Sequence, residues 1–397
     1  MRDELRLAII GAGPVGLALA IRAAQALPRA QVTLLDARST DHRVLDDPRT
    51  LALSLGSIQL LQQLGSWPEA AAQDILRVHI SQIPDAKARQ ALVLSAPEQG
   101  VPRLGAVLAY GEVVHALQNR WLALAAQDPK RLHTQFGHPV QAIRPAASTA
   151  SGAGPVEVDA AVVGTHDVAV IAEGGVFAQQ SRKAISRDYA QSAWVGRVTL
   201  SSLPQATAFE RFTPQGPVAL LPLPGASPTR ASAALVWCEN TPEASVAHLS
   251  ADQRVTVLQS LLPAAAGRVI ELSELKCFAL GLNAERALVQ GRQVRIGNAA
   301  QTLHPVAGQG LNLGLRDAFA LVQALQRNAN VDQALAKMQR SRAPDRWSMI
   351  ATTDFLARSF TWRVPGAMTL RGAALSVLSH LPGLRGALAR HMMMGWR

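Results

Sequence analysis

Apolar runs near the start of the chain alternate with an Ala- and Leu-rich segment, and together they predict a βαβ unit. Leu5 to Ile10 is an apolar run, as is typical of a strand buried in a parallel sheet. The helical segment that follows ends near Leu27, and a second strand-like run from Gln31 to Leu35 ends at Asp36. A further helix is expected from Leu51 to about Leu64.

Two longer segments, Ile75 to Leu94 and about Trp194 to Phe278, alternate apolar and polar residues and contain turn residues. Period-two alternation of this kind predicts antiparallel sheet. Between them, Gly111 to Ala126 has helical periodicity and is expected to return the chain to the first domain. Ala146 to Pro155, rich in Ala, Ser and Gly, is expected to form a loop or a hairpin tip.

Helical periodicity returns at about Leu311 and continues to the end, with breaks expected at Pro344, Pro365 and Pro382. The whole pattern predicts an α/β protein. A Rossmann-like dinucleotide domain is interrupted by an antiparallel-sheet substrate domain and followed by a C-terminal helical region. The expected boundaries are 1–74, 101–185 and 279–330 for the first domain, 75–100 and 186–278 for the second, and 331–397 for the third.

The composition indicates a packed globular protein and argues against nucleic-acid binding. Of 397 residues, 48% are hydrophobic and 17% are charged, which allows a substantial core. The net charge is +11, but only 4% of the residues are aromatic. No zinc spacing, recognition-helix signature or dense Lys/Arg run accompanies the positive charge. No nucleic-acid partner is therefore expected.

The positive charge is concentrated near the end of the chain. From Phe355 to Arg397 there are six Arg and no Asp or Glu, among many apolar residues. Such a segment suits contact with an anionic membrane surface, although a helical tail with a solvated arginine face fits equally well. No apolar run is long enough to cross a bilayer, and the N-terminus is typical of a strand and not of a signal peptide. We expect a cytoplasmic protein, peripheral at the inner face of the membrane.

The two cysteines, Cys238 and Cys277, lie in apolar strand-like segments. We expect both to be buried thiols without a disulfide, which suits a reducing cytoplasm. Neither has the spacing of metal ligands, so no metal site is expected.

A glycine fingerprint follows the first predicted strand. Gly11, Gly13 and Gly16 are spaced as G-x-G-x-x-G before a helix, and Asp36 lies 20 residues beyond Gly16 at the end of the next strand. The glycines allow a tight turn, close approach of a pyrophosphate and close helix packing, while Asp36 can bind ribose hydroxyls. This predicts a dinucleotide site, which by itself fits either NAD or FAD.

A second glycine-rich stretch runs from Gly297 to Asn312. It follows a short strand-like run at Val294 to Ile296 and opens onto a helical run that includes Leu311. Because Gly308 and Gly310 leave the backbone N–H groups of the helix start bare, and the helix dipole is positive there, the loop can seat anionic or electron-rich atoms. A nicotinamide dehydrogenase would not need this second site, so the pair of sites favours FAD.

These motifs resemble those of the class A flavoprotein monooxygenases, and within them the aromatic hydroxylases of ubiquinone biosynthesis. Two of them, Glu-Arg-Phe-Thr leading to Leu-Leu-Pro and His-Pro-x-x-Gly-Gln-Gly-x-Asn-x-Gly, are long and specific. Beyond the fingerprint, the matching segments are Asp47–Ser54, Glu210–Thr213, Gly216–Pro222, Leu235–Trp237, Gly297–Asp317 and Met392–Trp396.

The resemblance implies an FAD-dependent aromatic hydroxylase that consumes NAD(P)H and O2. Reduced flavin would form a C4a-hydroperoxide and deliver oxygen to the ring of a polyprenylated phenol. Other ubiquinone-biosynthesis proteins would be its partners. Many relatives have Gly-Asp where this chain has Gly297-Asn298, and the variant is similar to the 2-octaprenyl-6-methoxyphenol hydroxylase branch.

The resemblance also implies roles for matched positions. Gly11, Gly13 and Gly16 would contact the FAD pyrophosphate, and Asp36 the adenosine ribose. Arg49 would contact the phosphate and flavin region. Gly297 and Asn298 would reach the ribityl and pyrophosphate oxygens, and Gly308 to Asn312 would lie along the isoalloxazine. The full set of cofactor positions is Gly11, Gly13, Pro14, Val15, Gly16, Asp36, Ala37, Arg38, Arg49, Glu173, Gly174, Gly297, Asn298, Pro305, Gly308, Gln309, Gly310, Leu311 and Asn312.

The chain departs from the family pattern at two further places. The middle Asp-Gly motif, which serves FAD and NAD(P)H, is Glu173-Gly174, and Gly175 to Phe177 replace the usual small hydroxyl residues. The helix after Gly105 has Gly111 and Val114 where relatives often carry an Arg and a Gln near the flavin. These departures put nicotinamide binding and a flavin ligand on that helix in doubt.

No catalytic residue is evident from the sequence. His304 is a weak acid–base candidate, and a loop histidine that bonds backbone beside Pro305 is the competing interpretation. A flavin hydroxylase of a small soluble aromatic acid remains an alternative function. A catalytically silent flavin-binding assembly subunit is another, because of Glu173-Gly174.

Overall fold

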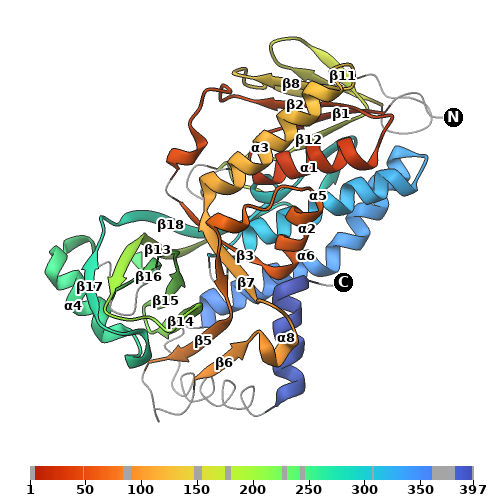
Figure 1. The fold of residues 1–397 in the computed structure, drawn as a ribbon. Helices are drawn as coiled ribbons and strands as arrows, with labels where there is room; N and C mark the ends of the chain where they lie inside the picture. Colours follow the sequence, from red (N-terminus) through yellow and green to blue (C-terminus); the bar gives the residue numbers. More distant parts are fainter. Residues whose placement is uncertain are drawn as a thin grey trace.

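The computed structural model places a parallel sheet at one end of the molecule and a larger, mostly antiparallel sheet at the other, with a small sheet between them (Figure 1). The residues that the structure describes are 5–47, 49–83, 91–146, 154–174, 180–225, 230–241, 246–305, 308–359 and 381–395. The expected loop at 147–153, Gly175 to Phe177, Pro365 and most of 355–397 lie outside them.

The predicted βαβ unit forms the centre of a six-stranded sheet. Four neighbouring strand pairs are parallel, and the edge strand β19 is antiparallel to β20. Nearly every residue of β1 and β2 is buried, as their apolar sequences require. In spatial order the strands are β19 (Val289–Gln290), β20 (Gln293–Arg295), β12 (Val168–Ile171), β1 (Arg6–Ile10), β2 (Gln31–Asp36) and β8 (Leu132–Phe136).

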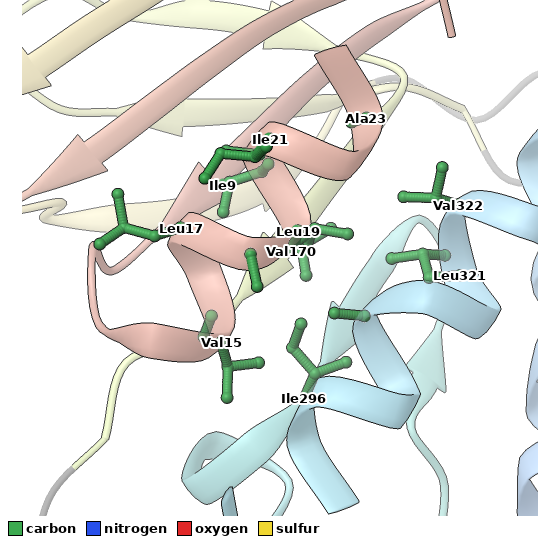
Figure 2. Close-up of a cluster of buried hydrophobic side chains, with 14 of the residues drawn as sticks. Ile9, Val15, Leu17, Leu19, Ile21, Ala23, Val170, Ile296, Leu321 and Val322 are labelled. Carbon is green, nitrogen blue, oxygen red and sulfur yellow. The ribbon is translucent and has the colours of Figure 1, made fainter. Parts of the chain in front are cut away.

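Helices cover one face of this sheet, and a three-stranded sheet covers the other. Figure 2 shows how Leu19 of α1, Val170 of β12 and Leu321 of α5 meet in the core on the helical side. On the opposite face, Ile10 packs against Val158 of the three-stranded sheet. The helices are α1 (Pro14–Ala26), α3 (Tyr110–Gln127), α5 (Gln309–Arg327) and α6 (Val331–Ser359), and the strands are β9 (Ala142–Pro145), β10 (Val156–Asp159) and β11 (Gly164–His166).

A small antiparallel sheet, in the order β3-β7-β4, lies between the two large sheets (Figure 1). Its strands are β3 (Thr50–Ser54), β7 (Gly105–Ala109) and β4 (Gln73–Ile75), and α2 (Leu55–Gln63) follows β3 directly. The helix expected from Leu51 therefore begins only at Leu55. The residues before it are strand because they pair with β7 in continuous register.

The large sheet holds the two alternating segments of the sequence. Its strands are β5 (Arg77–Gln82), β6 (Leu92–Ser95), β13 (Ile185–Leu200), β14 (Thr207–Thr213), β15 (Gly216–Pro222), β16 (Ala231–Asn240), β17 (Val269–Leu272), β18 (Lys276–Ala284) and β21 (Gln301–Thr302). It is not wholly antiparallel, because β5 and β14 run parallel. One face is covered by α4 (Ala251–Leu261), which the alternation of the segment did not predict (Figure 1).

The prediction of two buried cysteines is right for Cys238 and wrong for Cys277. Cys238 is buried on β16, in the middle of the sheet. Cys277 is exposed because it lies in the first half of β18, where β21 does not reach and the strand forms the sheet edge.

Of the breaks expected in the C-terminal region, the one at Pro344 is wrong and the one at Pro382 is confirmed. α6 continues through Pro344 without ending there. On either side of it, Arg342 binds Asp317 of α5 at 2.6 Å and Asp345 lies 3.3 Å from Arg316 of α5, so two buried ion pairs hold the helix to α5. α8 (Pro382–Met394) starts at Pro382, a residue that suits the first helical turn, and packs beside α2. Within the described residues, no helix is both long and apolar enough to span a bilayer.

Candidate functional site

The residues of the two glycine motifs come together at one edge of the parallel sheet. β1, β2, β12 and β20 all run in the same direction, so their carboxyl ends meet there. The residues at or after these ends are Gly11, Asp36, Glu173 and Gly297. In open α/β sheets, ligands bind at this edge. The structure thus gathers segments that are far apart in the sequence into one candidate site.

Two glycines of the fingerprint loop, Gly11 and Gly16, leave no room for a side chain. Gly11 has φ of 103°, and a Cβ there would lie 2.8 Å from the backbone nitrogen of Glu173. A Cβ on Gly16 would overlap the carbonyl oxygen of Gly11. Gly13 precedes α1 and Pro14 is its first residue, so the helix begins at this loop with its N-terminal N–H groups. A helix start of this kind can bind a phosphate group.

Asp36 closes the loop through its carboxylate. One oxygen accepts the N–H of Ala12 at 2.6 Å, and the Nε and Nη2 of Arg38 each donate to the carboxylate at 2.9 Å. Burial raises the pKa of Asp36, but the hydrogen bonds from Arg38 and Ala12 outweigh it and hold the pKa below its usual value. The carboxylate is therefore ionised and can accept hydrogen bonds from ribose hydroxyls. Ala37 is exposed beside it.

Glu173 and Gly174 follow β12 and connect the two glycine motifs. Glu173 lies against Gly11, and partial burial, followed by the charge of Asp36, raises the pKa of its carboxyl. A Cβ on Gly174 would lie 3.3 Å from the Cβ of Asn298. Glu173 and Gly174 therefore lie between the two glycine motifs, within the candidate site.

Gly297 and Asn298 lie between α1 and the start of α5. Gly297 has φ of 60°, and a Cβ there would lie 3.2 Å from a methyl carbon of Val15 in α1. A Cβ on Gly314 of α5 would lie 2.8 Å from a methyl carbon of Val15, so these elements need glycine to approach. The exposed side chain of Asn298 points toward Gly310, whose added Cβ would be 3.9 Å from its Oδ1. The first and second glycine motifs thus form one continuous surface.

α5 begins after a glycine in the left-handed conformation. Gly308 has φ of 58°, and its N–H donates to the carbonyl of Pro305 at 2.9 Å. The buried side chain of Asn312 donates to the carbonyl of Gly308 at 2.9 Å and accepts the N–H of Ser54 at 3.0 Å. The Asn312 side chain thus fixes the turn, and the backbone of Gln309 to Leu311 presents the helix N-terminus.

Arg49 extends from the loop before β3 and stacks on an aromatic ring that the sequence did not indicate. Its guanidinium lies 4.0 Å from the ring centroid of Tyr110 and 2.6 Å from a carboxylate oxygen of Asp47. The hydroxyl of Tyr110 is 3.6 Å from where a Cβ on Gly13 would be. Tyr110 therefore lies over the fingerprint loop. Its place directly after a strand, in a chain with two tyrosines, was the available signal.

The start of α3 offers no ligand at the two positions where the chain departs from the family. A Cβ on Gly111 would lie 2.8 Å from the Cα of Leu45, so the 3-10 turn Val44–Asp46 packs there instead of a side chain. Val114 is fully buried in the core. Arg49 and Tyr110 are the side chains that this region contributes.

His304 contacts two residues of the large sheet. It is buried, its Nε2 lies 3.0 Å from Oε1 of Gln191 on β13, and its ring packs edge-on against Tyr189. Burial lowers the pKa of His304 to about 4. Because of this low pKa, its imidazole is neutral near pH 7.

The large sheet turns one face toward this site. Ala208, Leu221 and Ala234 on this face pack against Val107 of β7, in the small sheet. We call this face, which packs against the small sheet, the inner face. The opposite face of the large sheet is covered by α4. The central residues of the inner face are apolar and only half-buried, which allows contact with an apolar ligand; they are Val195, Ala219, Leu221 and Val236.

Comparison with known proteins agrees with this geometry. Residues 177–353 match the family described as FAD binding domain. The 3-demethoxyubiquinol 3-hydroxylase of Escherichia coli strain K12 is 28% identical over 93% of each chain. The ubiquinone hydroxylase UbiL of Rhodospirillum rubrum is 32% identical over 52% of this chain and 48% of its own.

Solved structures share the fold. HpxO of Klebsiella pneumoniae, complexed with FAD and uric acid, superposes with a TM-score of 0.70 at 15% identity, covering 98% of this chain and 96% of its own. The chain therefore contains an FAD binding domain, shares its fold with FAD-dependent enzymes and is similar to the hydroxylases of ubiquinone biosynthesis.

Proposed function

We propose that this chain hydroxylates the aromatic ring of a polyprenylated phenol in ubiquinone biosynthesis, using FAD, NAD(P)H and O2. The observation that carries the proposal is the single surface formed by two glycine-lined helix starts, α1 and α5, together with the half-buried apolar inner face, which the small sheet connects to the start of α5. The names of the E. coli and R. rubrum relatives support the class of substrate.

The residues present fit FAD, because a Cβ would fill the cradle at Gly11 and Gly16. We assign the pyrophosphate to the fingerprint loop with Pro14 and Val15, and the adenosine ribose to Asp36. Tyr110 and Arg49 would cover the pyrophosphate. The ribityl chain would follow Gly297 and Asn298, and the ring would lie along Pro305 and Gly308 to Asn312, with Ala37, Arg38, Glu173 and Gly174 completing the set.

Bound FAD would supply the activated oxygen atom that is transferred to the phenol. The protein's own contribution is electrostatic and steric. The N-terminal N–H groups of α5 would stabilise negative charge on the reduced ring, because the helix dipole is positive there. The apolar residues of the inner face would hold the substrate and exclude water. The proposal includes the division of the chain into an FAD-binding domain, a substrate domain and a C-terminal helical region.

The function is tested by purifying the chain, recording the flavin spectrum and following NAD(P)H oxidation with phenols that carry short or long prenyl tails. We expect phenol-stimulated oxidation and a product heavier by one oxygen. Stimulation by small aromatic acids alone would favour the soluble-substrate alternative. Bound flavin with no phenol-dependent oxidation would favour the silent assembly subunit. Quinone intermediates that accumulate in a deletion strain would identify the substrate's ring position.

A peripheral position at the inner membrane face completes the proposal, since a polyprenyl tail partitions into lipid. The packing of α8, in the basic segment 355–397, determines which variants can test this position. Ala389 and Met393 of α8 are buried against Leu55, so their apolar surface is used within the protein. Removing residues 355–397 would therefore expose core, and single charges are the better target.

Replacing Arg363, Arg371 and Arg390 by Gln should weaken binding to anionic vesicles, by about 1 kcal/mol for each charge near the surface. Arg390 is exposed in the structure, and the other two lie outside the described residues. The matched control replaces three arginines elsewhere, Arg144, Arg230 and Arg268. Equal vesicle binding by both triple variants would contradict membrane docking through the segment 355–397.

A further inference from the structure

One carboxylate lies in the middle of the inner face. Glu210 of β14 pairs with Ala219 of β15 on one side and Ile80 of β5 on the other. The same row of residues continues across the sheet through Val236 and Val195. Paired residues in neighbouring strands share a face. Glu210 is therefore surrounded within the sheet by apolar, largely half-buried neighbours.

Contacts on one side of this row lead directly to the start of α5. Ala208, two residues before Glu210, packs in one cluster with Val107 of β7. Val107 pairs with Ala52 of β3, and a Cβ on Gly308 would lie 3.4 Å from the Cβ of Ala52. Glu210 and the proposed seat of the flavin ring thus border the same small sheet.

Contacts on the other side close the region with α6 and the loop before Gly308. Phe212, two residues after Glu210, packs with Leu356 of α6. Gln191 on the inner face of β13 binds His304. The Glu210 row therefore lies between the small sheet and these two elements, at the level where a substrate would meet the flavin.

Among the residues that the structure describes, no hydrogen-bond donor or cation is recorded at the Glu210 carboxylate, and burial alone raises its pKa to about 8. The titratable groups that share or border this face do not neutralise it. Burial, followed by the charge of Glu210, raises the pKa of Cys238, so this thiol stays protonated. His304 is neutral, and Lys276 at the far end of the row interacts with Asp47.

We propose that Glu210 is the catalytic base that removes the proton from the phenol hydroxyl before its ring is hydroxylated. In this step the phenol O–H bond breaks and an O–H bond forms on the Glu210 carboxylate, so the single negative charge moves to the phenol oxygen. The electron pair left on that oxygen increases the electron density of the ring. The inference rests on the proposed function, since it needs a phenol as substrate.

The other polar groups of the region are poorer bases. His304 is the weaker base, because burial lowers its pKa to about 4 and raises that of Glu210 to about 8. The hydroxyl of Tyr189 donates to Asp354 at 3.0 Å and burial raises its pKa. A base works best when its pKa approaches that of the phenol, about 10, while part of it remains ionised at the working pH.

The test compares Glu210→Gln, Glu210→Asp and wild type with the prenylated phenol. The control is Glu157→Gln, an exposed strand glutamate on β10. Glu210→Gln should keep its flavin spectrum and its reduction by NAD(P)H but lose about 10²–10³-fold in the rate of product formation. Wild-type product formation should rise with pH through about 8, since only the ionised carboxylate accepts a proton. The Gln variant should lose this dependence.

A more acidic phenol separates a base from a structural residue. With a fluorinated phenol that is already ionised, the deficit of Glu210→Gln should shrink to less than about tenfold, because no proton needs to be removed. An unchanged deficit, or unchanged product formation by Glu210→Gln, would overturn the inference while leaving the proposed function intact. A wild-type protein that hydroxylates no phenol would instead overturn the proposed function.

If Glu210→Gln does not fold, the pH dependence of the wild-type protein still tests the inference. If Glu210 is the base, the pH midpoint of product formation stays near 8 for phenols of different acidity. If the phenol ionises in solution before it binds, the midpoint shifts with the acidity of each phenol, and the inference fails.

Discussion

Replacing Asn312 by Ala should loosen the turn before α5 and destabilise the whole chain. The side chain is 2% exposed, accepts the N–H of Ser54 at 3.0 Å and donates to the Gly308 carbonyl at 2.9 Å. Leaving the Ser54 N–H without an acceptor costs about 1–3 kcal/mol, and losing the bond to Gly308 costs about 0.5–1.5 kcal/mol more. We therefore expect a loss of about 2–4 kcal/mol in the free energy of unfolding.

Urea unfolding of the flavin-free protein, followed by circular dichroism, measures this loss. The matched control is Asn328→Ala at the other end of the same helix, whose half-buried side chain donates to the Ala324 carbonyl at 2.7 Å. Its loss should be about 1 kcal/mol. Asn312→Asp keeps the acceptor for the Ser54 N–H but loses the donor to the Gly308 carbonyl. Its loss in the free energy of unfolding should lie between those of Asn312→Ala and Asn328→Ala.

The same substitution should weaken FAD, because Gly308 and the N–H groups after it lose their tether. A loss of about 1.4 kcal/mol in binding corresponds to a tenfold higher Kd. Equal stability losses for Asn312→Ala and Asn328→Ala, together with an unchanged Kd for FAD, would refute the assignment of Asn312 as the residue that fixes this turn.

Three further predictions concern the same region and the core beneath it. Gly308→Ala should cost about 1–2 kcal/mol, because φ is 58° there, and flavin fluorescence should report weaker FAD binding; unaltered binding would contradict the strained turn. Burial lowers the pKa of His304 to about 4, against about 6.5 in an unfolded chain. The unfolded state then binds more protons, so up to about 3 kcal/mol of stability, fully present above pH 6.5, is lost as the pH falls toward 4. In His304→Gln, the difference between the urea midpoints at pH 7.5 and pH 4.5 should be smaller than in the wild type. An equal difference in the two proteins would contradict this role of His304. Arg342→Met should cost about 3–5 kcal/mol, because it leaves the carboxylate of Asp317 buried without its partner at 2.6 Å. The double variant Arg342→Met with Asp317→Leu should recover much of that loss in thermal unfolding, and failure to recover would show that Asp317 is not the main cause of the loss, since Asp345 also loses its contact with Arg342.

The local parts of the candidate site could be predicted from the sequence. Gly11 and Gly16 are required by a turn that forms within a few residues, and the βαβ pattern around them is a short-range signal. Gly308 before α5 belongs to the same class, since a helix start with a left-handed glycine is a local feature. The gathering of these motifs at one sheet edge also follows from parallel strand order.

Features that depend on contacts between distant segments could not be predicted in this way. α6 passes through Pro344 because buried ion pairs to α5 hold it, and the helix expected from Leu51 starts late because β3 pairs with β7. α4 lies within a segment whose alternation predicted only strands.

The sequence by itself determined the FAD-type glycine motifs, the acidic residue after β2 and the class of fold, because each rests on neighbours along the chain. Only the tertiary structure decided which side chains face the site. It placed Tyr110 over the fingerprint loop, turned His304 toward Gln191, and left Glu210 on the inner face without a recorded partner among the described residues. These positions depend on strand register and sheet packing, which join residues that the sequence keeps far apart.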